Sequence, residues 1–266
     1  MIWGICLCIG LCSGLLAGLL GIGGGTVIVP ALIMWSGWLG IGGEDAAPVA
    51  MATALAIVIP TSISSARAHA VRGSIDWPAF RSLAPGIAVG ALIGTVVACA
   101  AGARLALGAF ICFALLAAAQ LVALPAATPE PNAPAAISGV WKLRPYSVAI
   151  GLLSALAGVG GGLLSVPMLA RHIPIRRAIG TAAALGLPLA VAGLVGYFLA
   201  GRPVQCAAGC VGFVFVPAVL AVSLAAIAAA PLGVNLAHRL PVHLLKRAFA
   251  ALLVVVCLDL AAQLLR

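Results

Sequence analysis

Long apolar stretches separated by short polar segments dominate the sequence. They cover residues 2–38, 48–68, 79–100, 104–124, 146–170, 177–200, 211–236 and 242–264. Most are close to the length of about 20 residues that a helix needs to cross the hydrocarbon core of a bilayer. Alternating strands of about ten residues, which a membrane barrel requires, are not found. The pattern predicts an all-α polytopic membrane protein.

The apolar pattern repeats in the second half of the chain. Residues Gly14 to Pro30 read GLLAGLLGIGGGTVIVP, and Gly151 to Pro167 read GLLSALAGVGGGLLSVP. A weaker match pairs MATALAIVIP, from Met51 to Pro60, with IGTAAALGLP, from Ile179 to Pro188. Two homologous halves in a membrane protein are typical of transporters.

The two halves are separated by a proline-rich segment. We expect repeat 1 at residues 1–124, a linker at 125–145 and repeat 2 at 146–266. The linker contains the run Pro-Glu-Pro-Asn-Ala-Pro, and prolines at that density prevent a continuous helix. Each half then holds four of the apolar segments.

Composition supports a lipid environment. The chain is 64% hydrophobic and 7% charged, with 14 Lys+Arg against five acids, whereas a soluble domain has about 25% charged residues. The net charge of +9 lies in short clusters between apolar segments, which is expected of membrane topology and not of a nucleic-acid partner. The first residues lack a basic region before the apolar stretch, so we expect no cleaved signal peptide.

The charges of the loops place the two halves in opposite orientations. The loop after the first segment is acidic in the first half (Glu44, Asp45) and basic in the second (Arg171 to Arg177). The next loop is basic in the first half and nearly neutral in the second. Because cytoplasmic loops carry the excess of Lys and Arg, the halves are predicted to be inverted repeats.

Inversion requires an odd number of crossings per half. The first segment of each half is interrupted by Gly-Gly-Gly, and each glycine costs about 1 kcal/mol relative to Ala in a helix. We therefore predict that this glycine-broken segment is re-entrant and is followed by three transmembrane helices, with both chain ends extracytoplasmic. Eight simple crossings with broken first helices are the alternative, which agrees poorly with the charge bias.

The glycine runs are the main candidate site. Each predicts a helix start near Thr26 or Leu163, where unpaired N–H groups and about half a positive charge favour an anion. The candidate residues are Gly23, Gly24, Gly25 and Thr26 in the first half and Gly160, Gly161 and Gly162 in the second. The other interpretation is that these glycines only allow helices to pack closely. A nucleotide loop is excluded because no Gly-Lys-Ser/Thr follows.

Hydroxyl residues inside the apolar segments are further candidates. Thr53 and Thr181 occupy equivalent positions of the repeat, and a polar run from Thr61 to Ser65 occurs in the first half only. Hydroxyls donate to oxyanions, but they also bond to their own helix or join helices. Arg67 and His69, at the end of this segment, are interpreted mainly as topology determinants.

Enzymatic, metal and cofactor sites find little support. The eight cysteines follow no metal-binding spacing, and no Ser–His–Asp or Cys–His arrangement stands out. Cys206 and Cys210 flank a short loop, where a disulfide in an extracytoplasmic loop and two unpaired thiols both remain open. No apolar segment has an acid at its centre, which disfavours a carboxylate relay for protons.

At the paired Gly-x-Gly-Gly-Gly motifs the chain resembles the TauE/SafE family of sulfite exporters. The stretches GLLAGLLGIGGGTVIVP, GTAAALGLP and LAHRLPVHLLKRAFA carry the likeness, which covers nearly the whole chain, although the loop from Trp35 to Pro48 departs from it. The resemblance implies an inner-membrane permease for sulfite, sulfonates or related sulfur anions.

Together these observations predict a transporter that exports a small sulfur oxyanion, driven by the membrane potential. An anion channel with the same site and an uptake permease are the alternatives. A non-transporting scaffold or intramembrane enzyme is disfavoured, because neither needs irregular backbone at mid-depth. The lipid bilayer is the only other expected partner, and nothing in the sequence indicates an oligomer.

Overall fold

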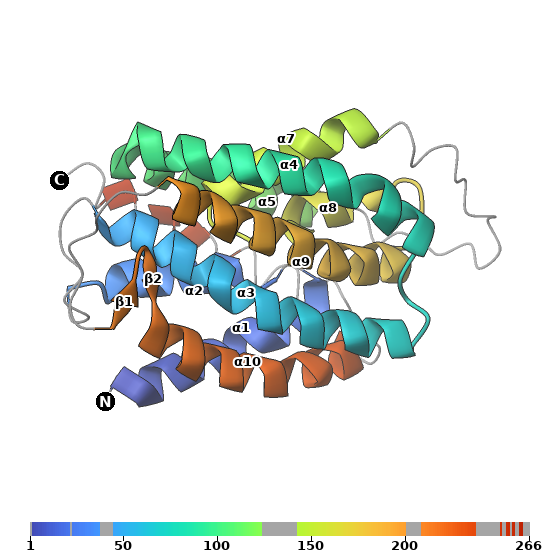
Figure 1. The fold of residues 1–266 in the computed structure, drawn as a ribbon. Helices are drawn as coiled ribbons and strands as arrows, with labels where there is room; N and C mark the ends of the chain where they lie inside the picture. Colours follow the sequence, from blue (N-terminus) through green and yellow to red (C-terminus); the bar gives the residue numbers. More distant parts are fainter. Residues whose placement is uncertain are drawn as a thin grey trace.

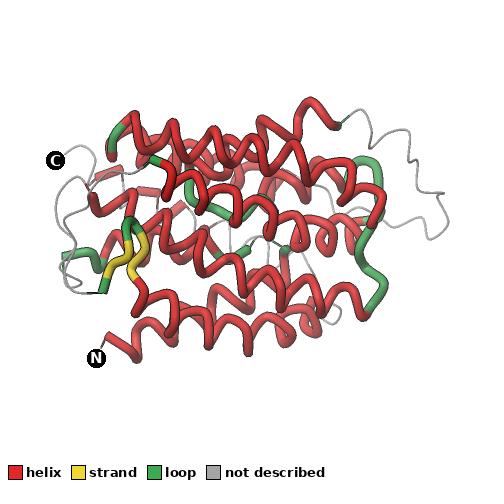
Figure 2. Tube along the Cα trace, in the orientation of Figure 1, coloured by secondary structure: helices red, strands yellow, loops and turns green. Residues whose placement is uncertain are grey.

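The computed structural model describes residues 2–21, 23–37, 45–123, 143–200 and 209–237, together with positions 251, 254, 255, 257, 258, 261 and 262. These residues are mostly helical, and the long helices run roughly along one direction of the bundle (Figures 1 and 2). Among the described helices, five are long and apolar enough to cross a membrane: Trp3–Leu20, Ala46–Val71, Trp77–Ala100, Ile175–Leu199 and Val216–Leu236. The prediction of a multi-pass helical membrane protein is therefore confirmed.

Five helices are described in the first half. They are α1 (Ile2–Leu20), α2 (Gly25–Met34), α3 (Ala46–Val71), α4 (Trp77–Ala101) and α5 (Ala103–Ala123). The predicted first segment, 2–38, divides at its glycines into α1 and α2. The other three segments match the sequence-based boundaries within three residues.

The second half follows the same order. Its elements are α7 (Arg144–Leu156), α8 (Gly162–Leu169), α9 (Ile175–Leu199), β1 (Cys210–Val211), β2 (Val214–Phe215) and α10 (Val216–Ala237). The predicted helix beginning at 211 instead opens with an antiparallel β1–β2 hairpin, which turns through Gly212 at φ +58°. Most of the segment 242–264 and most of the linker 125–145 lie outside the described residues.

The helices of one half pack on those of the other in matching pairs. Helix α1 packs on α10, and α7, its counterpart, packs on α4. Helices α3 and α9 pack against each other at the centre, α3 also against α10 and α9 also against α4. The first helix of each half therefore lies on the fourth described helix of the opposite half, an arrangement that Figure 1 shows at the two sides of the bundle.

Glycines allow these helix pairs to approach closely. A Cβ atom on Gly14 of α1 would lie 2.5 Å from Ala226 Cα, and one on Gly151 of α7 would lie 2.9 Å from Ile87 Cα. Gly14 and Gly151 are the first residues of the repeated glycine-rich stretch. The same close approach occurs with the glycine on the other helix in two further pairs, Gly233 with Leu15 and Gly94 with Leu152. Small residues at helix crossings are the usual means of packing helices in membranes.

The directions of the helices show at which end of the bundle the loops and the charged residues lie. In Figure 1, α1 and α3 begin at the same end of the bundle, whereas α7 and α9 begin at the opposite end. Asp45 precedes α3 at the first end. At the opposite end, Arg72 follows α3, Arg144 opens α7, and Arg176 lies in the first turn of α9.

Candidate functional site

The first glycine run breaks the chain between α1 and α2. Gly21, Gly23 and Gly24 have φ of +68°, +78° and +71°. Residues with a side chain rarely adopt this left-handed region, so glycine is needed for the helix to end and restart within four residues. Helix α2 starts at Gly25, one residue before the predicted position.

The second run makes a break of different backbone geometry. Helix α7 ends at Leu156, Gly158 has φ +64°, and α8 starts at Gly162. Gly161, which precedes α8, has an ordinary right-handed φ of −59°. The predicted break is confirmed in both halves, but only the first requires glycine at the residue that caps the new helix.

The two breaks lie directly against each other. A Cβ atom on Gly23 would be 3.1 Å from Gly160 Cα, and one on Gly25 would be 3.0 Å from the Gly158 carbonyl oxygen. Gly158 is also packed against Met51 of α3, with the Met51 Cβ 2.6 Å from the position of an added methyl. The glycines predicted from sequence are therefore gathered in one place inside the bundle.

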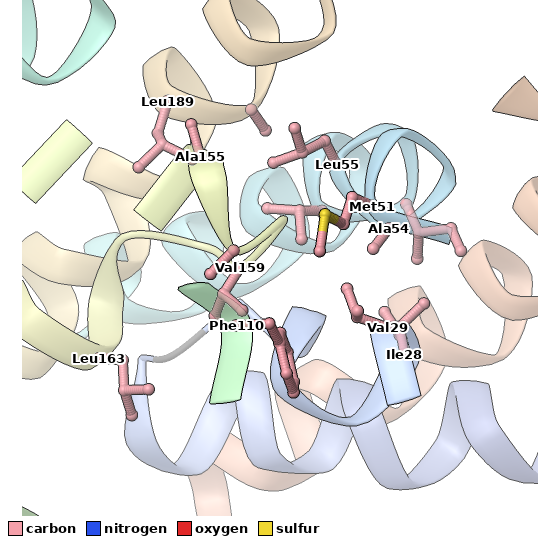
Figure 3. Packing of buried hydrophobic residues seen from close by; sticks show 14 of the residues in the cluster. Ile28, Val29, Met51, Ala54, Leu55, Phe110, Ala155, Val159, Leu163 and Leu189 are labelled. Atoms are coloured by element: carbon pink, nitrogen blue, oxygen red, sulfur yellow. The ribbon is translucent and has the colours of Figure 1, made fainter. Parts of the chain in front are cut away.

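Apolar side chains from several elements enclose this place. Figure 3 shows Met51 of α3, Val159 of the second break and Leu189 of α9 in one buried cluster. Leu189 Cδ1 would lie 2.8 Å from a Cβ atom on Gly161, so it covers the start of α8. The two helix starts are thus shielded from bulk water, which strengthens electrostatic interactions there.

Two hydroxyls lie in the first turns of the restarting helices. Thr26 of α2 and Ser165 of α8 are each 1% exposed, and neither hydroxyl has a hydrogen-bond partner within the described ranges. Ser165 Oγ is 3.8 Å from the position of a Cβ on Gly161. Sequence reasoning identified Thr26 but missed Ser165, because Ser165 aligns with the apolar Ile28 and not with Thr26. A buried hydroxyl without a partner is uncommon and calls for an explanation.

Thr53 and Thr181 do not lie free in this site. Thr53 Oγ1 accepts a hydrogen bond of 3.0 Å from the backbone N–H of Phe215, and Thr181 Oγ1 accepts one of 2.9 Å from that of Asp76. Phe215 directly precedes α10, and Asp76 directly precedes α4. The two threonines therefore hold the starts of these helices, which is the helix-joining role that the sequence left open.

The polar run of α3 divides between bonded and free hydroxyls. Thr61 donates to the Ile57 carbonyl of its own helix at 2.8 Å, and Ser65 donates to the Ala17 carbonyl at the end of α1 at 3.3 Å. Ser62 is buried, and its hydroxyl has no hydrogen-bond partner in the described part of the chain. Only one residue of this run is therefore available for a ligand without breaking a bond within the protein.

His69 contacts the end of α1, in addition to any role in membrane topology. It is 2% exposed, and its Nε2 lies 3.1 Å from the Gly18 carbonyl oxygen. The last carbonyls of a helix have no partner within the helix, so the imidazole supplies one where the glycine break removes it. Arg67, in contrast, is exposed, as expected of a topology determinant.

No metal-binding group is found in the part of the chain that the structure describes, where no three His, Cys, Asp or Glu residues gather. Cys210 is disulfide-bonded and is therefore not an unpaired thiol. Cys206 lies outside the described ranges. The breaks themselves contain no charged residue: the hydrogen-bond donors there are backbone N–H groups and hydroxyls. Such a set of neutral donors suits an anion or a polar acceptor.

Comparison with known proteins places the chain in context. Residues 6–260 match the family model described as Sulfite exporter TauE/SafE. A probable membrane transporter protein of Haemophilus influenzae is 32% identical over 264 residues, covering 96% of this chain and 97% of the relative. A probable membrane transporter protein of Methanocaldococcus jannaschii is 27% identical over 247 residues, covering 89% and 87%. No solved structure matches the chain significantly.

Proposed function

Because the chain belongs to the TauE/SafE sulfite exporter family of membrane transporters, we propose that it carries a small sulfur oxyanion, sulfite or an organosulfonate, out of the cell across the inner membrane. The observation that carries this proposal is the contact between the two glycine breaks. It brings two helix starts to one buried place.

The proposed anion site consists of the N–H groups at the starts of α2 and α8 together with nearby hydroxyls. Each helix start carries about half a positive charge and unpaired N–H donors. Glycines admit an anion close to the backbone because no Cβ stands in the way. The binding residues are Gly23, Gly24, Gly25 and Thr26 from one half and Gly160, Gly161 and Gly162 from the other, with Ser165 added. Thr53 and Thr181 position the surrounding helices.

We also propose that the two halves are inverted repeats with re-entrant first segments. Helix α2 has ten residues, which span about 15 Å, half of the hydrocarbon core of about 30 Å. Its chain then continues to α3, which begins at the same end of the bundle as α1 (Figure 1). The second half has the same order from the opposite end. In this arrangement each half contributes three crossings.

Charges and the disulfide support an orientation. The arginines at the ends of α3, α7 and α9 lie at one end of the bundle, which would face the cytoplasm by the charge bias of loops. The hairpin with disulfide-bonded Cys210 lies at the other end (Figure 1). Disulfides persist in oxidising compartments, so that end would face outward, with both chain ends on the same side.

The membrane potential is a sufficient driving force for the proposed export. Moving one elementary charge through 100 mV is worth about 2.3 kcal/mol. An anion leaving a cell that is negative inside gains this energy, so export needs no coupled ion.

The test is the flux of labelled sulfite in proteoliposomes with an imposed potential. We expect saturable flux that follows the sign of the potential and is reduced by competing sulfonates. The variant carrying both Gly24→Val and Gly161→Val is the matched negative control, provided that it reaches the membrane in normal amount. Flux that rises linearly without saturation would indicate a channel, and the absence of any sulfur-anion movement would reject the proposed function.

A further inference from the structure

Ser62 has an unusual position among the polar residues of α3. Its side chain is 1% exposed, and its hydroxyl has no hydrogen-bond partner among the residues that the structure describes. Thr61 beside it is 0% exposed but donates to Ile57 of the same helix. Leaving a buried hydroxyl unpaired is unfavourable, and a serine in a helix can usually avoid this by donating to its own backbone.

The face of α3 that carries Ser62 is turned toward the first glycine break. Residues at i, i+4 and i+7 lie on one face of a helix, which groups Val58, Ser62 and Ser65. Val58 Cγ1 is 3.5 Å from the position of a Cβ on Gly23. Ser65 bonds the Ala17 carbonyl just before the break. Ser62 lies between these two contacts, and its hydroxyl is therefore beside the break.

Gly186 on α9 has no side chain, and this provides the space next to the Ser62 hydroxyl. A Cβ atom on Gly186 would lie 2.6 Å from Ser62 Oγ, so a side chain at that position would force the hydroxyl to move. One turn further along α9, Leu189 covers Gly161 at the start of α8. The same face of α9 thus adjoins Ser62 and the second helix start.

From these contacts we infer that Ser62 donates a hydrogen bond to the transported anion and that Gly186 provides the room for it. This inference rests on the proposed function, to which it adds a specificity-determining hydroxyl. An anion between the helix starts would give the Ser62 hydroxyl the acceptor that the protein does not supply. The bond would be charge-assisted and stronger than a neutral one.

The second half has no equivalent donor. Ser62 stands two residues after Pro60, and the residue two after Pro188 is Ala190. The pair of backbone helix starts is shared by both halves, but this hydroxyl comes from one half alone. The two halves of the site are therefore not interchangeable.

The first experiment compares Ser62→Ala with Thr61→Val in the sulfite flux assay. Hydrogen bonds to a charged group contribute about 1.5–3 kcal/mol, so Ser62→Ala is expected to raise KM about 10- to 150-fold. Thr61→Val removes a neighbouring buried hydroxyl that is already bonded, and its KM is expected to stay within about twofold. Stabilisation of the purified protein against heating by added sulfite should fall in parallel, for Ser62→Ala only.

A second experiment changes the space and keeps the hydroxyl. Gly186→Ala places a methyl against Ser62 Oγ, whereas Gly193→Ala on the same helix meets the flexible Leu55 Cδ1 at 2.9 Å and Thr95 Cγ2 at 3.4 Å, and neither of these is a polar atom. Raised KM in Gly186→Ala but not in Gly193→Ala supports the inference. Wild-type KM in both Ser62→Ala and Gly186→Ala, with normal flux in the wild type, overturns the inference and leaves the proposed function intact. Absence of flux in the wild type rejects both.

Discussion

The hydroxyl oxygen of Thr53 accepts a hydrogen bond of 3.0 Å from the backbone N–H of Phe215, which joins α3 to the start of α10 in the opposite half. The equivalent threonine, Thr181, makes the equivalent bond to Asp76 at the start of α4. Phe215 and Asp76 differ in side chain, and only their backbone groups take part. The matching bonds recur because the same helices meet in both halves, even where the sequences differ.

We predict that Thr53→Val and Thr181→Val destabilise the protein by similar amounts. Each leaves a buried backbone N–H without an acceptor, which costs about 1–3 kcal/mol. The measurement is the free energy of unfolding, or the shift of the thermal midpoint, of the detergent-solubilised protein. Thr95→Val is the control, since Thr95 bonds only carbonyls of its own helix. An effect in one threonine variant but not in the other would contradict the equivalence of the two bonds.

The two glycines before the restarting helices are predicted to differ in tolerance. Gly24 has φ +71°, where an L-residue costs about 1–2 kcal/mol, and its added Cβ would lie 3.0 Å from the Ser13 carbonyl oxygen. Gly161 has φ −59°, and its added Cβ would meet the movable end of Leu189 at 2.8 Å and Ser165 Oγ at 3.8 Å. Gly24→Ala should therefore lose more sulfite flux per molecule than Gly161→Ala. Equal loss in both would show that φ at this position is not what limits the site.

The helix crossings are predicted to depend on Gly14 and Gly151. Valine at either position would collide with the backbone of the facing helix, and overpacking of this kind costs about 1–3 kcal/mol or more. We expect Gly14→Val and Gly151→Val to reduce the monodisperse fraction of tagged protein in size-exclusion chromatography. Gly4→Val is the matched control on α1, because no atom lies within 4 Å of its added Cβ. If Gly4→Val behaves like Gly14→Val, the cause is helix propensity and not packing.

The proposed topology predicts the compartment of two positions. A reporter that is active only in the cytoplasm should be active when inserted after Gly73, in the open turn between α3 and α4, and silent when fused at Arg266. The reason is that the bundle end carrying the basic helix ends is assigned to the cytoplasm. Cytoplasmic activity at Arg266 would remove the model of three crossings per half.

Much of the fold is readable from local sequence, because its causes are local. The apolar segments give the helices, since a bilayer requires about 20 apolar residues for each crossing. The glycine runs give the breaks, because three consecutive glycines remove helix propensity whatever their surroundings. The start of α10 was misplaced because the hairpin before it is made of Val and Phe, which are apolar in a strand as in a helix.

The site is determined partly by sequence and partly by tertiary structure. The sequence by itself determined that helices restart near Thr26 and Leu163, one residue from the observed starts at Gly25 and Gly162, since that depends on backbone freedom within a few residues. Only the tertiary structure decided that the two helix starts lie against each other and that the Thr53 hydroxyl accepts a bond from the Phe215 N–H. It also decided that the Ser62 hydroxyl has no partner among the described residues. Whether a hydroxyl is bonded depends on which backbone groups the packing of distant helices brings within about 3 Å, and no local pattern of residues contains that distance.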